Sequence, residues 1–225
     1  MLDVNEQQKK WGEEVANAYL KWPDENVIRF MNRTFKNHDK TNIKVLDFGC
    51  GAGRNTVALA EDGFQVYGVD YSEECVKITK QRCEKLKNSR VMIKQNNSTD
   101  IPIEDNVLDS VIACGSLFYT NLQDRKLLLK NINRVLKNGG VFWGNWRSTE
   151  DSRYKKGEKI EKNFYILNTE GREGLAYYFS TIEELKELYN YAGFEIYNIE
   201  KLEVTTYNLK EKEVWWNISA KKISR

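Results

Sequence analysis

Short apolar runs alternate with longer amphipathic runs along this chain, and their order predicts its secondary structure. Apolar runs of about four to eight residues are typical of buried strands, and apolar residues that recur every three or four positions are typical of helices. Because strands and helices alternate between residues 45 and 146, we expect an α/β fold with a parallel sheet. Predicted strands cover residues 45–47, 65–70, 91–95, 107–114, 141–145, 194–200 and 214–220, and predicted helices cover residues 5–20, 23–35, 55–61, 73–88, 122–137 and 181–193.

Glycine occupies every second position after the first predicted strand. That strand runs into Asp47, and Gly49, Gly51 and Gly53 follow before a helix that begins at Asn55. Glycine permits positive φ angles and lets a ligand approach the main chain, while the helix N-terminus offers free N–H donors. The pattern favours a ligand-binding turn; the alternative is a turn that only connects two elements.

The second predicted strand ends in an acid, Asp70, whose carboxylate can accept hydrogen bonds from both hydroxyls of a ribose. Together with the glycine turn, this acid favours an adenosine-type ligand. A dinucleotide-binding turn needs a third small residue, and Arg54 or Thr56 stands there in the two registers that can be counted. A nicotinamide-dependent oxidoreductase is therefore disfavoured, and we expect no binding of the reduced nicotinamide cofactor.

Composition and charge narrow the class of protein further. The 225 residues suffice for one core, and the net charge of +2, from 35 basic and 33 acidic residues, gives no reason to expect nucleic acid as a partner. The four cysteines form no C-x-x-C pair, and with one histidine they predict reduced thiols and no metal site. The chain shows neither a signal peptide nor an apolar run long enough for a membrane span, so we expect a cytoplasmic protein.

The motif Asp47-x-Gly49-x-Gly51-x-Gly53 resembles motif I of the class I S-adenosylmethionine-dependent methyltransferases. The resemblance covers residues 40–146, where the run 134–140 is similar to the approach to the family's fifth strand, and Gly193-Phe194 matches a Gly-Phe step before its sixth. It implies a single domain over residues 1–225 with a doubly wound, seven-stranded, mostly parallel sheet. Helices would cover both faces, and the last two strands would form an antiparallel hairpin.

The resemblance also implies the cofactor, S-adenosylmethionine, and its contacts. In the family the glycine turn packs against the methionine part, an acid matching Asp70 holds the ribose, and a loop matching residues 96–100 meets the adenine. Asn97 stands where an acid is common, and the alternative is that this polar run is only a turn. The residues predicted to bind the cofactor are Trp11, Tyr19, Asp47, Gly49, Cys50, Gly51, Gly53, Asp70, Tyr71, Asn97, Ser98, Thr99 and Ser116.

Residues 1–37 are predicted to form a helical lid, because an N-terminal helical segment closes over the cofactor in related methyltransferases. Trp11 and Tyr19 recur on one helix face, and aromatic rings near the sulfonium would attract it through cation–π interactions. The alternative is that both rings only pack against the protein.

The acceptor side is predicted from position. Residues 146–179 show no firm periodicity of apolar positions, but they leave the sheet at its ligand-facing edge. We therefore expect an insertion that forms part of the acceptor pocket. The alternative is a solvated charged loop. Family members place groups beside donor and acceptor after the fourth strand, where packing is the alternative for Phe118. The residues predicted to bind substrate are Phe118, Tyr119, Arg147, Arg153 and Tyr154.

The catalytic residue is unknown from sequence. Asp100, Tyr119 and Tyr154 are weak candidates for a general base, and His38 lies in a polar connection that makes it a poor one.

We expect methyl transfer to an oxygen or nitrogen of a small polar metabolite, with a sugar or another biosynthetic precursor suggested by family analogy alone. The only prolines are Pro23 and Pro102, so the Asn/Asp-Pro-Pro-aromatic motif of exocyclic-amine methyltransferases is absent. The alternative is a non-catalytic partner subunit with the same fold. A homodimer is left open, because Trp215 and Trp216 could form a core pair or part of a dimer face.

Overall fold

The computed structural model describes residues 20–86, 90–97 and 99–223. The predicted helix over residues 5–20, with Trp11 and Tyr19, and the predicted adenine contact Ser98 lie outside the described residues.

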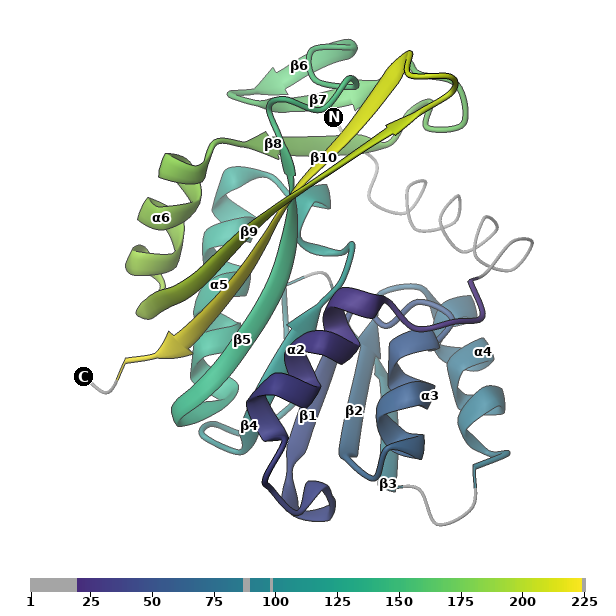
Figure 1. Cartoon of the computed structure of the whole chain (residues 1–225), viewed down its shortest axis with the longest axis vertical. Helices are drawn as coiled ribbons and strands as arrows, with labels where there is room; N and C mark the ends of the chain where they lie inside the picture. Colours follow the sequence, from purple (N-terminus) through teal and green to yellow (C-terminus); the bar gives the residue numbers. More distant parts are fainter. Residues whose placement is uncertain (1–19, 87–89, 98, 224–225) are drawn as a thin grey trace.

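The centre of the fold is a parallel sheet with the strand order β3-β2-β1-β4-β5 (Figure 1). The C-terminal hairpin of β9 and β10 extends it, because β10 pairs antiparallel with β5 and β9 pairs antiparallel with β10. These seven strands confirm the predicted sheet and its antiparallel hairpin. They are β1 (Lys44–Phe48), β2 (Gln65–Asp70), β3 (Arg90–Gln95), β4 (Leu108–Ala113), β5 (Leu136–Ser148), β9 (Phe194–Thr206) and β10 (Glu211–Lys222).

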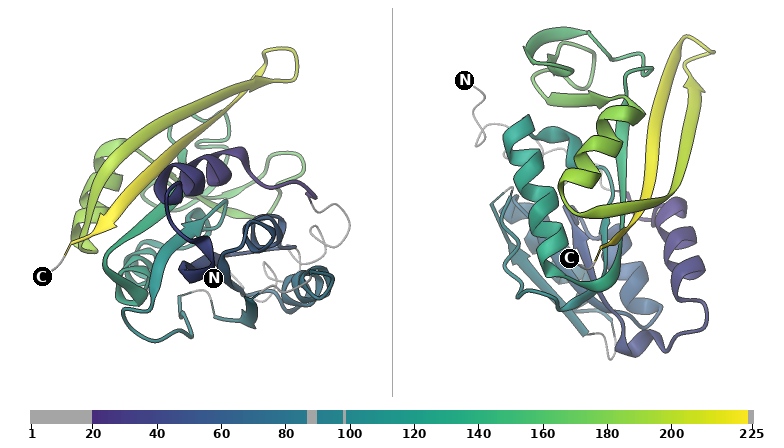
Figure 2. Two further views of the ribbon diagram at one scale, coloured as in Figure 1. Left: turned by 60° about the horizontal axis from the view of Figure 1, so that its bottom comes forward. Right: turned by 90° about the vertical axis from the view of Figure 1, so that its left-hand side faces the viewer.

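Helices cover both faces of the sheet, as predicted (Figure 2). Alternate residues of a strand point to opposite faces, so Val45 packs under one set of helices and Leu46 under the other. The first set is α2 (Glu25–Phe35) and α3 (Arg54–Glu61), with α4 (Glu73–Cys83) beside α3, and the second set is α5 (Leu122–Val135) and α6 (Ile182–Tyr191). Short 3₁₀ helices cover Lys40–Asn42 (η1) and Leu117–Tyr119 (η2).

Side-chain caps explain where several helices begin. The Ser72 side chain accepts a hydrogen bond from the Cys75 N–H at the start of α4. A capping box begins α6, where Thr181 accepts from the Glu184 N–H and the Glu184 carboxylate accepts from the Thr181 N–H. Such caps satisfy N–H groups that have no partner within the helix.

Several predicted boundaries are wrong, among them the end of β9, which runs to Thr206 rather than to residue 200. Helix α4 ends at Cys83 rather than near residue 88, and α5 ends at Val135, after which β5 begins at Leu136 rather than at residue 141. Leu136 pairs with Leu108 of β4, and the register then shifts before Ser110 pairs with Val141. The early strand start therefore depends on a pairing partner distant in sequence, which local helix propensity does not reveal.

The segment over residues 146–179 is largely a packed β-structure. It contains β6 (Gly157–Glu161) and β7 (Phe164–Leu167) and leads into β8 (Ala176–Ser180), and these three strands pair antiparallel. Every residue of β8 is buried, and its end pairs parallel with the end of β5, which makes one ten-stranded sheet. A solvated loop is therefore wrong for β7 and β8, while a role in the acceptor pocket stays a prediction.

The part of the predicted lid that the structure describes includes α2, which packs on the sheet. Val27, Phe30, Met31 and Phe35 of α2 are buried in the same core as Trp143 of β5. A closing motion of residues 1–37 stays a prediction. Within the described part of the chain, no helix combines the length and the apolarity needed to cross a bilayer.

Candidate cofactor and acceptor site

The glycine turn lies at the carboxyl end of β1 and is tied to β2. The N–H groups of Gly49 and Cys50 both donate to the carbonyl oxygen of Val69, at 2.9 and 3.0 Å. Gly49, Gly51 and Gly53 have φ angles of 69°, 54° and 77°. This left-handed region is open to glycine at little cost, so the spacing of three glycines is what allows the chain to turn here.

Two of these glycines meet different surroundings. A Cβ atom built on Gly49 would lie 2.4 Å from the Cβ of Ser116, so Gly49 lets β1 and the end of β4 approach each other. Among the described residues, no atom lies within 4 Å of a Cβ built on Gly51. The main chain at Gly51 therefore borders space in which a ligand could lie.

Asp70 is buried directly beside this turn. Its Oδ2 accepts a hydrogen bond from the Gly51 N–H and its Oδ1 accepts one from the Ser72 N–H, both at 2.9 Å. Burial raises the pKa of the Asp70 carboxyl, and the backbone N–H groups oppose that rise. The structure thus brings together the two features that the sequence analysis linked, the glycine turn and the acid after β2.

Asp47 occupies a different place, beneath the turn. It is buried, and its Oδ2 accepts a hydrogen bond of 2.6 Å from the Thr56 hydroxyl of α3. Burial raises the pKa of Asp47 to about 6, although the bond to Thr56 acts in the opposite direction. Asp47 therefore joins β1 to α3, and a direct cofactor contact for this residue stays a prediction.

Helix α4 holds the turn from outside, which the sequence analysis missed. The Thr79 hydroxyl donates to the Gly51 carbonyl at 2.6 Å, and Arg82 donates to the Ala52 carbonyl. The available signal was Thr79 itself, a hydroxyl on the apolar face of a predicted helix, because a buried hydroxyl needs a partner.

The end of β4 carries Gly115 and Ser116 beside the turn. The Ser116 hydroxyl donates to the Phe48 carbonyl at 2.9 Å, and the Gly115 N–H donates to Oδ1 of Asn145 on β5 at 2.6 Å. Asn145 is a second missed residue, and its signal was an amide within a buried strand. Gly115 has a φ of 72° and, like Gly51, has no described atom within 4 Å of a built Cβ.

The predicted adenine loop is an ordered turn in its described part. The Asp100 N–H donates to the side-chain oxygen of Asn97 at 3.0 Å, and Thr99 accepts from the Asn131 side chain. The loop is joined to Asp70 at the end of β2, because the Asn96 N–H donates to the Asp70 main-chain carbonyl at 3.0 Å. Its position beside Asp70 agrees with the prediction, while the adenine contact of Asn97 stays one.

Aromatic rings gather where η2 meets β8. The ring centroids of Tyr119 and Tyr177 lie 5.2 Å apart at an interplanar angle of 89°, and Phe118 packs behind them at 5.1 Å from Tyr177. Phe118 is fully buried, which favours its packing interpretation. Burial and the hydrogen bond with Tyr177 raise the pKa of Tyr119 well above its ordinary value, so its hydroxyl stays protonated near neutral pH.

The two predicted substrate-binding arginines have carboxylate partners within the chain. Arg147 donates to Asp151 at 2.9 Å and to Glu213 at 3.2 Å, and its guanidinium lies 3.5 Å from the ring centroid of Trp215. Arg153 pairs with Glu213 at 2.7 Å. Both arginines thus take part in a buried ion-pair network, and an acceptor would have to compete with these carboxylates.

Tyr154 and the tryptophan pair also have partners within the chain. The Tyr154 hydroxyl donates to Asn163 at 2.7 Å. Trp215 and Trp216 are half-buried against the main core, and the indole N–H of Trp216 donates to the Ser180 carbonyl. The exposed side chain of His38 lies beside Phe35, away from the glycine turn.

Comparison with known proteins places this geometry in a family. A family model described as a methyltransferase domain matches residues 45–140. The demethylmenaquinone methyltransferase of Bacillus mycoides is 39% identical over 105 residues, which are 45% of this chain and 43% of that protein. The Staphylococcus carnosus protein of the same name is 30% identical over 175 residues, which are 69% of each chain.

A solved structure shares the fold. A methyltransferase from Methanosarcina mazei described as SAM-dependent superposes with a TM-score of 0.73 at 21% identity, covering 85% of this chain and 98% of that one. The match spans less than half of the Bacillus mycoides relative and about two thirds of the Staphylococcus carnosus relative. The glycine turn, the acid Asp70 at the end of β2, the sheet order and these matches agree, and the chain belongs to the class I S-adenosylmethionine-dependent methyltransferases.

Proposed function

We propose that this protein transfers the methyl group of S-adenosylmethionine to a small molecule. The observation that carries the proposal is the contact between Gly51 and Asp70, which puts an open stretch of main chain directly beside a buried carboxylate. The first can border the methionine part of the cofactor and the second can accept from its ribose hydroxyls.

The surrounding residues fit this cofactor. The Asp70 carboxylate accepts backbone N–H groups from Gly51, Ser72 and Tyr71 in the structure, and because a carboxylate has about four lone-pair sites, it can still accept a ribose hydroxyl. Gly53 is the N-cap of α3 and supplies no side-chain cap, and the Thr56 N–H already bonds to Asp47, so the N–H groups of Arg54 and Asn55 are the ones that can donate to the cofactor's carboxylate. A side chain at Gly51 or Gly115 would enter the bordering space.

The bound cofactor supplies a sulfonium-activated methyl group, and the chain supplies orientation. Asp70 would hold the ribose, and the turn over Gly49–Gly53 would hold the methionine part with its methyl group, beside the residues that follow β4. Holding an acceptor atom in line about 3 Å from that methyl can contribute roughly 7–11 kcal/mol toward the barrier, because the reactants are already brought together.

The described residues favour a reaction that needs no strong base. Tyr119 stays protonated near neutral pH, the Tyr154 hydroxyl is a hydrogen-bond donor to Asn163, and Asp100 is exposed in a turn. The acceptor we propose is a small polar molecule that offers an oxygen or nitrogen. The half-buried ring of Tyr119, which packs against the buried ring of Tyr177, favours an acceptor with a planar ring, and the two demethylmenaquinone methyltransferases make a quinone-type ring the first class to screen.

Calorimetric titration with S-adenosylhomocysteine tests the cofactor part. We expect micromolar binding to the wild type, strong loss in Asp70→Ala and Asp70→Asn, and no change in Asp105→Asn, whose carboxylate lies on the surface beside Arg134. Folding of each variant is checked by circular dichroism. No binding to the wild type would overturn the proposal and favour a non-catalytic partner subunit.

Labelled methyl transfer tests the acceptor part. Aromatic hydroxyl, quinol and amine acceptors are screened together with sugar acceptors in the presence of the labelled donor. If a ring-bearing acceptor is methylated, and its turnover falls in Tyr177→Leu, the result would support an acceptor contact with the Tyr119 and Tyr177 rings. Turnover of sugars alone would overturn the ring preference while leaving methyl transfer intact.

A further inference from the structure

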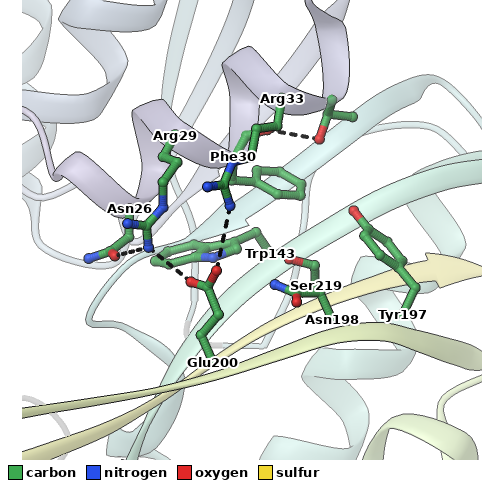
Figure 3. A pocket seen from close by; sticks show the side chains of 10 residues that line it. Asn26, Arg29, Phe30, Arg33, Trp143, Tyr197, Asn198, Glu200 and Ser219 are labelled. Carbon is green, nitrogen blue, oxygen red and sulfur yellow. Dashed lines mark hydrogen bonds and ion pairs between the residues drawn. The ribbon is translucent and has the colours of Figure 1, made fainter.

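A cavity that no residue of the glycine turn lines lies between α2 and the C-terminal hairpin (Figure 3). Its volume is about 310 Å³, and its walls come from α2, β5, β9 and β10. Ligand pockets for small molecules measure roughly 300–1,000 Å³, so this cavity suits a molecule of one or two rings.

The floor of the cavity is aromatic. Phe30 of α2 and Trp143 of β5 are almost fully buried, and their ring centroids lie 6.5 Å apart at an interplanar angle of 34°. Both rings belong to the core under α2, so their positions are fixed by packing. The parts of these rings that border the cavity give it an apolar floor for a planar molecule.

The rim carries two arginines and one carboxylate. Arg29 donates to Oε2 of Glu200 at 2.9 Å, whereas Arg33 reaches Oε1 of the same residue only at 3.6 Å. Figure 3 shows both guanidinium groups directed at Glu200 above the Trp143 ring. One carboxylate thus faces two permanent positive charges, and the Arg33 side chain, 68% exposed, keeps donors for another anion.

The remaining wall is polar and ordered. Tyr197 of β9 lines this wall together with Thr34 of α2 and Ser219 of β10, so the wall includes residues of both the helix and the hairpin. The Arg29 guanidinium also donates to Asn26 at 2.8 Å, which holds it at the rim. The cavity is therefore bounded by residues that bond to one another.

We propose that this cavity binds a small planar aromatic molecule that carries one carboxylate. The rings would lie against Phe30 and Trp143, and the carboxylate would bind Arg33 and share Arg29 with Glu200. The paired N–H donors of a guanidinium match the two oxygens of a carboxylate. A neutral ligand has no carboxylate and could not use this match. The site is separate from the glycine turn and does not depend on methyl transfer, so its test uses binding alone.

The probes are 2-naphthoate and its neutral counterpart 2-naphthamide, titrated calorimetrically at low ionic strength. We expect 2-naphthoate to bind about tenfold or more tightly than the amide, because charge-assisted hydrogen bonds are roughly twice as strong as neutral ones. Arg33→Gln should weaken the acid about tenfold and leave the amide unchanged. Glu200→Gln should tighten the acid several-fold, because the competing carboxylate is gone.

Lys36→Gln is the matched control. Lys36 is an exposed cation at the C-cap of α2, close in sequence to Arg33, and it does not line the cavity. Binding is located by the indole N–H resonance of Trp143, assigned with Trp143→Phe, which should shift with 2-naphthoate. The proposal would be overturned if the acid and the amide bound with equal affinity, or if Glu200→Gln did not tighten binding of the acid. It would also be overturned if the Trp143 resonance did not move, or if Lys36→Gln weakened the acid as much as Arg33→Gln does.

Discussion

The hydroxyl of Thr79 donates a 2.6 Å hydrogen bond to the carbonyl oxygen of Gly51, although the two residues belong to different βα units of the fold. Helix α4 thereby holds the middle of the glycine turn from the side opposite Asp70, whose carboxylate accepts the Gly51 N–H. The N–H and the carbonyl of Gly51 are thus both hydrogen-bonded to side chains. The position of the turn therefore depends on β2 and α4 as well as on β1.

Thr79→Val should loosen the turn without creating a cavity. The two side chains are similar in shape, so the main loss is one buried hydrogen bond, about 1 kcal/mol of the free energy of unfolding. We expect the dissociation constant of S-adenosylhomocysteine to rise several-fold, measured by calorimetry. Thr205→Val, on the exposed part of β9, should change neither quantity. An unchanged dissociation constant in Thr79→Val would show that the bond does not position the turn.

Gly51→Ala and Gly171→Ala form a matched pair. Both glycines have positive φ angles, 54° and 72°, and neither has a described atom within 4 Å of a built Cβ. Each variant should lose about 1–2 kcal/mol of the free energy of unfolding, because an L-residue is strained in this conformation. Only Gly51→Ala should weaken S-adenosylhomocysteine, by about tenfold or more, because its methyl group enters the cofactor's space. Equal affinities in the two variants would place the cofactor elsewhere.

Asp47 should make stability fall as pH rises. Its pKa is raised from 3.8 to about 6 in the folded protein, because burial disfavours the carboxylate. The folded state therefore binds the proton more tightly than the unfolded state, and stability is lost between about pH 4 and pH 6.5. Asp47→Asn lacks this loss, so its stability relative to wild type should improve by up to about 3 kcal/mol from pH 4 to pH 7.5.

The measurement is urea unfolding of wild type and Asp47→Asn at both pH values. Taking the difference between the two proteins removes the contributions of other titrating groups. A difference that does not change with pH would contradict the raised pKa.

Arg147→Gln should act on stability. Arg147 is buried between Asp151 and Glu213 and stacks on Trp215, so its removal leaves a buried carboxylate short of its partner. We expect a loss of about 3 kcal/mol of the free energy of unfolding, measured by urea titration, with unchanged binding of S-adenosylhomocysteine.

Lys201→Gln breaks an exposed ion pair with Glu150 and should cost less than about 1 kcal/mol. If Arg147→Gln proved as stable as Lys201→Gln but lost acceptor affinity, the predicted substrate-binding role of Arg147 would be favoured over its structural one.

The contact between the glycine turn and Asp70 could be predicted because its signals are local. Gly49, Gly51 and Gly53 follow one strand and Asp70 ends the next, and the carboxyl ends of adjacent parallel strands meet at one edge of the sheet. The Thr181–Glu184 capping box was equally visible, since it depends on a spacing of three residues. Patterns of this kind are set by backbone geometry, which the local sequence encodes.

The acceptor half was predicted less well, because its residues are selected by pairing across the sheet. The strands β7 and β8 are buried on both faces or nearly so, and they lack the alternation that would have revealed them. Arg147 and Arg153 were predicted to bind substrate, but they pair with Asp151 and Glu213, and Glu213 is brought to them by the packing of β10 against β5.

The chain's own pattern of glycines, acids and apolar runs thus determines the family, the order of elements and the position of the cofactor turn. Folding alone decides which side chains from distant elements support that turn, such as Thr79 and Asn145, and creates the cavity between α2 and the hairpin. The physical reason is the distance along the chain between the residues on which each feature depends. A φ angle or a helix cap depends on neighbours along the chain, whereas a buried hydrogen bond, an ion pair or a cavity depends on which surfaces pack together.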